Sequence, residues 1–325
     1  MTPTSFRARS ISPCRPLLPR GPELMSDILS VVLRILSFVL QLQAAGTVFF
    51  AAAFGPALTI SLPGVRTLAR ATAVAALFVV AGHYLLEAAR MAGDMSGVFD
   101  SNLQNVAWTS SSGGAFAVRE LGLLLIIAGM RATPASITRS FPTFGLTRLF
   151  ARGFTIVGVT GAVLVAASFT LTGHTATNAQ RGFLAPLLLA HLLIIAFWFG
   201  ALLPLCLVTL RESRERTSRV VTIFSASAFW LVPLILIAGV AMAVLLLPNV
   251  AALARPYGEF VITKSVLFAV LLALASLNKW RFGPALGRGE LVAGRAFRRT
   301  VVSEYVIIIV VLSVTAVMTA FFAPE

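Results

Sequence analysis

The chain alternates between long apolar runs and short polar segments from about residue 32 to its end. Each run has close to the ~20 residues that an α-helix needs to cross the hydrocarbon core of a bilayer. The third run is the weakest, because Arg119 and Glu120 lie at its start. The pattern predicts an all-α membrane protein, a polytopic bundle of about eight transmembrane helices. The eight predicted spans are 32–56, 68–92, 116–132, 153–174, 183–209, 222–247, 258–280 and 301–323.

The segments between these runs are too short and too polar to fold by themselves. The longest of them are 93–115, 131–152 and 281–300, and none has the apolar periodicity of a soluble domain. We therefore expect one eight-span membrane domain over residues 25–325.

Residues 1–24 differ from the rest of the chain, since they contain five prolines and four arginines. Proline opposes helix formation and arginine opposes membrane insertion. This composition predicts a disordered leader or a mis-assigned start, with Met25 as the expected initiator.

The overall composition agrees with a membrane protein, because 58% of the residues are hydrophobic and only 12% are charged. The formal net charge of +14 would suggest nucleic-acid binding in a soluble chain. Here the basic residues are concentrated in alternate loops, so we interpret the charge as a topology signal and expect no nucleic-acid partner. The two cysteines, Cys14 and Cys206, are too few for a disulfide framework or a thiolate metal cluster.

The arginine distribution predicts the orientation of the spans. The loops after the first, third, fifth and seventh runs hold sixteen basic residues: Arg66, Arg70, Arg131, Arg139, Arg148, Arg152, Arg211, Arg214, Arg216, Arg219, Lys279, Arg281, Arg288, Arg295, Arg298 and Arg299. The opposite side has only four: Arg90, Arg119, Arg181 and Arg255. Basic loops stay in the cytoplasm, which places both termini on the outer side.

Ionisable side chains inside a membrane are unfavourable, so each one is a functional candidate, with helix–helix contacts as the alternative explanation. The chain has three histidines, His83, His174 and His191, and the predicted orientation places all three in the outer half of the membrane. At 1.5 Å per residue, His83 lies on the order of 10 Å and His191 on the order of 15 Å below the outer surface. This shared depth suggests one site that opens outward.

The residues around His83 indicate the chemistry of that site. His83, Glu87 and Met91 are spaced by four residues and share one helical face, which Met95 continues if the helix does. Imidazole and thioether donors suit copper, whereas the lack of cysteine pairs argues against zinc or iron–sulfur. We therefore predict a copper site formed by three histidines and two additional ligands: His83, His174, His191, Glu87 and Met91. In the alternative interpretation, Met91 and Met95 fill an interface and Glu87 pairs with Arg90.

His191 lies on the same helical face as Trp198, and Gly200 would allow another helix to approach closely. In the alternative interpretation, His191 only bonds a neighbouring backbone group. Lys264 and Glu304 do not form a catalytic pattern, and Asn278 is interpreted as an interhelical contact or an end cap. We expect no enzymatic activity.

About half of the chain, residues 170–325, resembles the copper resistance D (CopD) family of bacterial inner-membrane proteins. The first half resembles it only in its layout of four spans, so the resemblance supports His174 and His191 but not His83. The matching stretches are Thr172-Gly173-His174-Thr175-Ala176, His191 through Trp198-Phe199-Gly200, Phe224-Ser225, Gly239, Tyr257-Gly258, Lys264, Leu277-Asn278-Lys279, Pro284, Ser303-Glu304 and Thr315-Ala316.

The resemblance implies a role in copper homeostasis in the bacterial inner (cytoplasmic) membrane, with copper ions passing from the periplasm into or across the bilayer. A separate periplasmic copper carrier protein would deliver the ion, and the lipid bilayer is the other partner. The sequence shows no nucleotide-binding loop and no phosphorylatable aspartate in a soluble domain. Transport would therefore be passive or coupled to another ion.

Two other functions remain open at this stage. Histidines on facing transmembrane helices hold b-type haem, and His83 with His191 would be the axial pair of an electron-transfer protein. Alternatively, the chain is a non-transporting assembly or scaffold protein whose buried polar residues only join helices.

Overall fold

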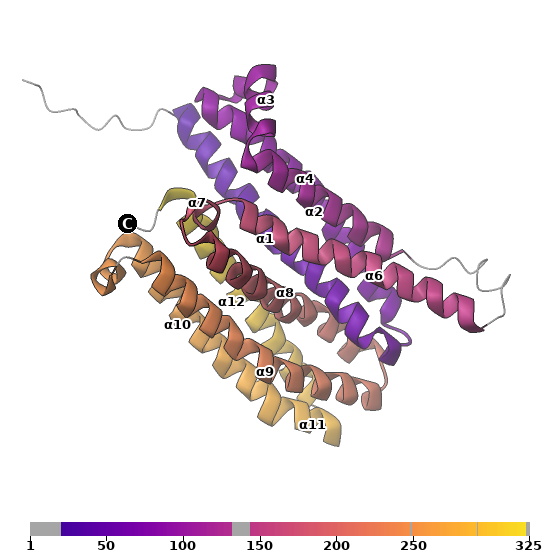
Figure 1. Cartoon of the computed structure of the whole chain (residues 1–325). Coiled ribbons are helices and arrows are strands. Elements are labelled where there is room, and N and C mark those ends of the chain that lie inside the picture. Colours follow the sequence, from indigo (N-terminus) through magenta and orange to yellow (C-terminus); the bar gives the residue numbers. More distant parts are fainter. Residues whose placement is uncertain (1–20, 132–143, 248, 291, 323–325) are drawn as a thin grey trace, which may run out of the picture.

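The computed structural model describes residues 21–131, 144–247, 249–290 and 292–322, without the side chains of 21–26, 144–152, 174 and 175. Within these ranges the regular structure is entirely helical (Figure 1). Eight of the helices are long and apolar enough to cross a membrane. The predicted polytopic bundle of eight transmembrane helices is confirmed.

The eight long helices overlap the eight apolar runs. Their bounds are α1 (Gly21–Phe54), α2 (Leu62–Ala92), α4 (Ser111–Gly129), α6 (Phe144–Ser168), α8 (Arg181–Arg211), α9 (Arg214–Leu246), α10 (Pro256–Leu277) and α12 (Ala293–Phe321). The third span is a full helix with Arg119 and Glu120 inside it. Helix α1 begins at Gly21, so residues 21–24, which the composition assigns to the leader, belong to this helix.

The predicted loops contain short helical elements. On the side of α3 (Ser101–Thr109) lie η2 (Met95–Phe99), η3 (Phe169–Leu171), α7 (His174–Thr177) and η4 (Val250–Ala254). Asp94 caps η2 by accepting a hydrogen bond from the Ser96 N–H. Asp100 caps α3 by accepting from the N–H groups of Asn102 and Leu103. We call this side the α3 end. The other side, with η1 (Gly55–Ala57), the π-helical turn η5 (Asn278–Phe282) and α11 (Gly283–Arg288), is the basic end.

Helix α1 lies at the centre of the bundle, where it contacts α2, α6, α8 and α12. It crosses α8 at Gly46 and Gly200, and a Cβ placed on Gly46 would lie 1.7 Å from the carbonyl oxygen of Ala196. At this crossing Gln43 Nε2 donates a hydrogen bond of 3.1 Å to the Gly200 carbonyl. Glycine at both positions is therefore required for the two helices to pass this closely.

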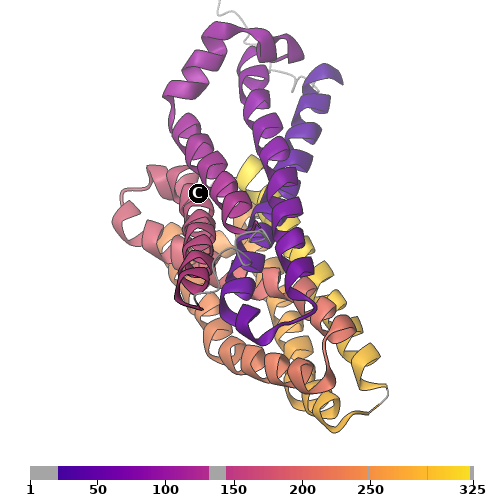
Figure 2. The ribbon, with the colours of Figure 1, turned by 90° about the vertical axis from the view of Figure 1, so that its right-hand side faces the viewer.

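The crossing joins two groups of helices. The N-half consists of α1, α2, α4 and α6, in indigo to magenta, and the C-half consists of α8, α9, α10 and α12, in red-brown to yellow (Figures 1 and 2). In both views the halves lie side by side, and α12 packs on both α8 and α1.

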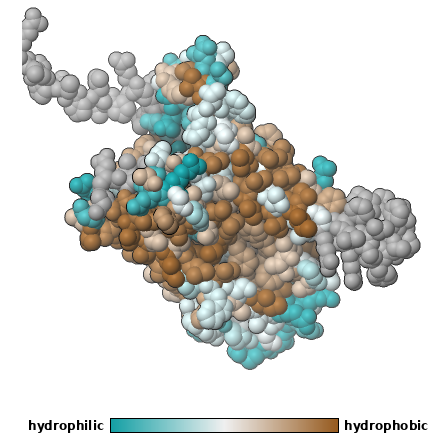
Figure 3. All heavy atoms as spheres, in the orientation of Figure 1, coloured by the Kyte–Doolittle hydropathy of each residue, from teal (hydrophilic) through white to brown (hydrophobic). Residues whose placement is uncertain are grey.

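The surface has the polarity that a bilayer requires. In the face shown by Figure 3, an apolar band covers the middle of the molecule and polar residues gather at its two ends. Phe78, Trp230 and Val244 are more than 70% exposed on α2 and α9. Such exposure of large apolar side chains is expected where they face lipid rather than water.

A single carboxylate joins the two halves at the basic end. Glu212, in the turn between α8 and α9, accepts hydrogen bonds of 2.8–2.9 Å from the backbone N–H groups of Thr59, Ile60 and Ser61. The hydroxyls of Thr59 and Ser61 also donate to it. Burial opposes the charge of Glu212, but the hydrogen bonds outweigh this effect and lower its pKa to about 2. The carboxylate is thus held ionised against the start of α2.

Candidate functional site

His191 is held in a defined orientation inside the C-half. Its Nδ1 lies 3.1 Å from the carbonyl oxygen of Ile235 on α9. A carbonyl oxygen only accepts, so Nδ1 carries the hydrogen and Nε2 keeps its lone pair. Metal-binding histidines are usually oriented by this kind of bond from the other ring nitrogen. The backbone bond that the sequence offered as an alternative is present, and it leaves Nε2 suited to bind a metal.

The space beside His191 is shaped by α9 and α10. Gly239 lies one turn after Ile235, and a Cβ added there would be 3.6 Å from His191 Cε1. Lys264 on α10 interacts electrostatically with the imidazole. A cation at Nε2 would therefore be held by few donors and in the field of a nearby ammonium group.

A second polar group, the Glu304 cluster, consists of Trp198, Asn278, Thr300 and Glu304. Glu304 on α12 is only 2% exposed, and its Oε1 accepts a hydrogen bond of 2.6 Å from Asn278 Nδ2. The indole N–H of Trp198 on α8 also donates to this carboxyl. The hydroxyl of Thr300 donates to Asn278 Oδ1, which fixes the orientation of the amide. Within the described part of the chain, no basic side chain forms an ion pair with Glu304.

Asn278 shows what the sequence identified and what it missed. The residue ends α10, begins the π-helical turn η5 and bonds α12, so both predicted roles, end cap and interhelical contact, are correct. Its partnership with Glu304 was not predicted. Both residues lie in stretches that carry the family resemblance, which was the available signal. Single π-turns are frequent at functional sites.

Helix α8 connects His191 with the Glu304 cluster. His191 and Trp198 are seven residues apart, which puts them on the same face about 10 Å apart along the axis. From the α3 end inward, this face presents first an imidazole and then the indole that bonds the Glu304 carboxyl. The C-half therefore has polar groups at two depths along one helix.

The surroundings of His83 are different. Arg34 on α1, Arg119 on α4 and Arg90 on α2 all interact electrostatically with its imidazole. Glu87 accepts a hydrogen bond of 2.7 Å from Ser112 Oγ, and it forms no ion pair within the described ranges, so the pair with Arg90 that the alternative interpretation offered is not seen. Three positive charges near His83 oppose a copper cation there.

The side chains that the structure describes do not show the predicted copper ligands grouped around one point. The neighbours of His83 and Glu87 lie in the N-half, whereas His191 neighbours α9 and α10. Met91 is 45% exposed near the end of α2. His174 begins α7, and its side chain lies outside the described part. Among the side chains that are described, no three from His, Cys, Asp and Glu are grouped to hold a metal. The copper site therefore stays a prediction.

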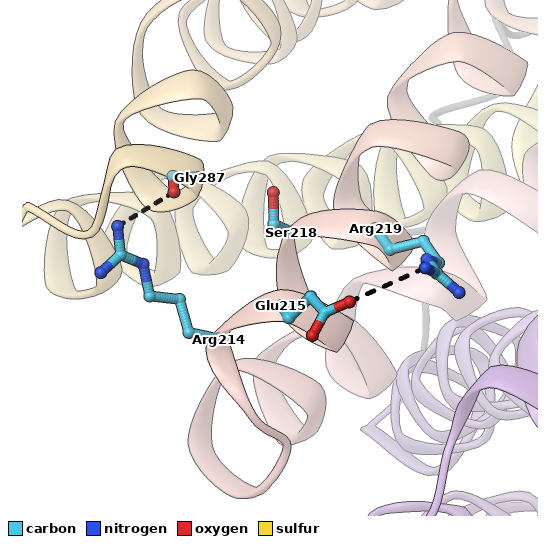
Figure 4. Close-up of a pocket in the computed structure, with 5 residues that line it drawn as sticks. All are labelled: Arg214, Glu215, Ser218, Arg219 and Gly287. Carbon is cyan, nitrogen blue, oxygen red and sulfur yellow. Dashed lines mark hydrogen bonds and ion pairs between the residues drawn. The ribbon is translucent and has the colours of Figure 1, made fainter.

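Two hollows of the surface lie at the basic end. One is lined by Arg214, Glu215, Ser218, Arg219 and Gly287, where α9 begins beside α11 (Figure 4). Arg214 donates to the Gly287 carbonyl at 3.0 Å, and Arg219 pairs with Glu215 at 3.8 Å. A second hollow is lined by Arg295, Arg298 and Arg299 of α12. Both are open, basic surfaces on the side opposite the predicted copper site.

Comparison with known proteins finds a family match within the C-half. No curated protein and no solved structure matches the chain. Residues 218–318, which cover most of α9, all of α10 and most of α12, match the family model of copper resistance protein D (CopD). Gly239, Lys264, Asn278 and Glu304 lie within this match. This match supports membership of the copper resistance D family, and the described part of the chain is that of a membrane protein with several spans.

Proposed function

We propose that the protein moves copper ions across the membrane through its C-half, with His191 as a ligand on the route. The observation that carries this proposal is the bond from His191 Nδ1 to the Ile235 carbonyl. It presents Nε2 as a metal ligand beside α9, a helix that belongs to the CopD match.

The surroundings of His191 suit passage better than storage. Imidazole binds both oxidation states of copper. A transported ion must also leave, so few ligands and modest affinity are expected. The ammonium group of Lys264 lowers the affinity for a cation further. Helix α7 packs against α8, so His174 at its start is the expected second imidazole at the mouth of the route.

The Glu304 cluster supports the inner part of the same route. A buried carboxyl group without a basic partner is unfavourable in a bilayer and marks ion or proton pathways. Glu304 on α12 accepts from Trp198, which lies two helical turns deeper than His191 along α8, and in its ionised form it would offset the charge of a passing cation. The proposed direction is from the α3 end, expected in the periplasm, to the basic end.

The predicted copper ligands on α2 lie outside this route. His83, Glu87 and Met91 remain part of the predicted outer site, but the arginines around His83 oppose a cation. A route through the C-half requires His191 and does not require His83, which gives a matched pair of variants.

The test is cellular copper content, measured by elemental analysis with and without the protein expressed. We expect expression to raise copper content, His191→Ala to abolish the rise, and His174→Ala to remove most of it. His83→Ala replaces the same side chain in the other half and should leave the rise in place. All variants must reach the membrane in equal amounts.

Two outcomes would support another function. Wild-type accumulation in both His174→Ala and His191→Ala would make these histidines packing residues and favour the scaffold function. An intense visible absorption band in the purified protein would indicate haem and an electron-transfer role.

A further inference from the structure

The N-half contains three arginines, with a neutral histidine and a tyrosine beside them, that the copper route does not use. We call this group the arginine cluster: Arg34 of α1, His83, Tyr84 and Arg90 of α2, and Arg119 of α4. Electrostatic interactions link Arg34 with Arg90, Arg119 with Arg34, and His83 with all three arginines. These helices lie outside the residues matched to the CopD family.

The positive charge of this cluster is not balanced by carboxylates. None of the three arginines forms an ion pair with a carboxylate in the described ranges. Glu87 is the acidic group that interacts with both Arg34 and Arg119, and its short hydrogen bond comes from Ser112. One acidic and three basic groups leave an excess of two positive charges. Unpaired charge of this kind is strongly unfavourable in a membrane.

The guanidinium group of Arg119 contacts neutral side chains instead of a carboxylate. Its Nε donates to Ser168 Oγ at 3.0 Å, and its Nη2 lies 3.5 Å from Thr172 Oγ1. Its guanidinium carbon lies 4.8 Å from the centre of the Phe169 ring. All three partners are neutral, so they fix the guanidinium without neutralising it.

The polar groups beside the arginines also lack partners. His83 Nε2 and Tyr84 Oη are buried and form no hydrogen bond within the part of the chain that is described. The Tyr84 ring is fixed by stacking on Phe116, with the ring centres 4.3 Å apart. Guanidinium groups only donate, and an imidazole N–H and a phenol can donate as well. Because the cluster is rich in donors and short of acceptors, the missing partner is an anion.

We propose that the arginine cluster binds a phosphate group. Guanidinium groups bind phosphate through paired hydrogen bonds, and a phosphate monoanion or dianion matches the excess charge. The source is either the headgroup of an anionic phospholipid or free inorganic phosphate.

The position of the cluster favours the lipid. Arg90 lies two residues before the end of α2, and His83 lies nine residues before that end, so His83 is about 10 Å deeper than Arg90. A headgroup drawn down along α2 would therefore meet the arginines in turn. Leu85, Leu121 and Leu124 are 43–54% exposed on α2 and α4 and offer an apolar surface to acyl chains.

The experiment measures the thermal unfolding midpoint of the full chain in nanodiscs of neutral phosphatidylcholine. One arm adds phosphatidylglycerol to the bilayer, a second adds inorganic phosphate, and a third adds sodium chloride at the same ionic strength. We expect phosphatidylglycerol to raise the midpoint more than chloride does. An increase with inorganic phosphate alone would assign the site to the free ion.

The variants are Arg34→Gln and Arg119→Gln, which remove one charge each without adding bulk. Each loses charge-assisted hydrogen bonds, so we expect at least tenfold weaker binding of the phosphate ligand. Arg255→Gln is the matched control, because Arg255 is an exposed arginine at the same α3 end and outside the cluster. If Arg119→Gln does not fold, Arg34→Gln gives the same comparison.

Two results would overturn the proposal. In one, neither phosphatidylglycerol nor phosphate raises the wild-type midpoint above the chloride value. In the other, the increase is as large in the folded cluster variant as in Arg255→Gln. Copper accumulation is not part of this measurement, so the result does not depend on the proposed copper route.

Discussion

Replacing Glu212 by glutamine would test how the two halves are joined at the basic end. Glutamine keeps the shape of the side chain and one acceptor oxygen but removes the charge. The backbone donors of Thr59, Ile60 and Ser61 would then bond a neutral oxygen, and such bonds are weaker than bonds to a carboxylate. We expect the variant to be less stable than the wild type.

The size of this loss of stability follows from the pKa of Glu212. Hydrogen bonding lowers the pKa of Glu212 from its ordinary 4.5 to about 2, a difference that corresponds to about 3 kcal/mol. Ile60 is 61% exposed, so solvent screens part of this interaction. We therefore expect Glu212→Gln to lower the free energy of unfolding by about 2 kcal/mol at pH 7.

The sign of the pH dependence is fixed by the same argument. Because the pKa is lower in the folded protein, this stabilisation is complete above pH 4.5 and is lost as the pH falls from 4.5 towards 2. The difference in stability between wild type and Glu212→Gln should shrink over that range. This difference is measured by reversible unfolding in a denaturing detergent, monitored by circular dichroism at several pH values.

Glu215→Gln is the matched control. Glu215 lies three residues further along, and its side chain is 88% exposed in a 3.8 Å pair with Arg219. Exposed pairs contribute little, so we expect a change below about 0.5 kcal/mol. Equal losses of stability in both variants, or an unchanged wild-type advantage over Glu212→Gln at low pH, would refute this role of Glu212.

Three further predictions follow from other parts of the molecule. Gly200→Ala places a methyl group 2.4 Å from the Gly46 Cα and should lower the free energy of unfolding in detergent by about 2–4 kcal/mol. In Gly82→Ala the new carbon would lie 3.7 Å from Leu33 Cδ1, so this control should not be destabilised. Equal losses in the two variants would contradict the close crossing of α1 and α8. Glu304→Gln should keep the protein folded, because its oxygen can still accept from Asn278, but should reduce copper accumulation severalfold by removing the charge; unchanged accumulation would exclude Glu304 from the route. A reporter that is active only in the periplasm should be active when fused after Ala323, and an inactive fusion on well-inserted protein would reverse the predicted orientation.

The sequence by itself determined the number and approximate position of the membrane spans. A helix satisfies its own backbone hydrogen bonds, so a run of about 20 apolar residues is sufficient to predict a span without knowing its neighbours. The same local information carried the family resemblance, which the family match confirms over residues 218–318, without the stretches around His174 and His191. The apolar pattern was less reliable at the ends of spans, where capping residues such as Ser110 extend the third helix beyond the apolar run.

The partners of the polar residues were decided only by the tertiary structure. Helical periodicity shows that His191 and Trp198 share a face of α8, but it does not show that this face meets Ile235 of α9 and Glu304 of α12. It likewise placed His83 and Glu87 on one face of α2 without revealing the arginines of α1 and α4 around them. In a bilayer, lipid-facing and helix-facing surfaces are both apolar, so hydropathy does not distinguish them. Close approaches such as Gly46 against Gly200, rather than the apolar pattern, set which helices meet and which polar groups they bring together.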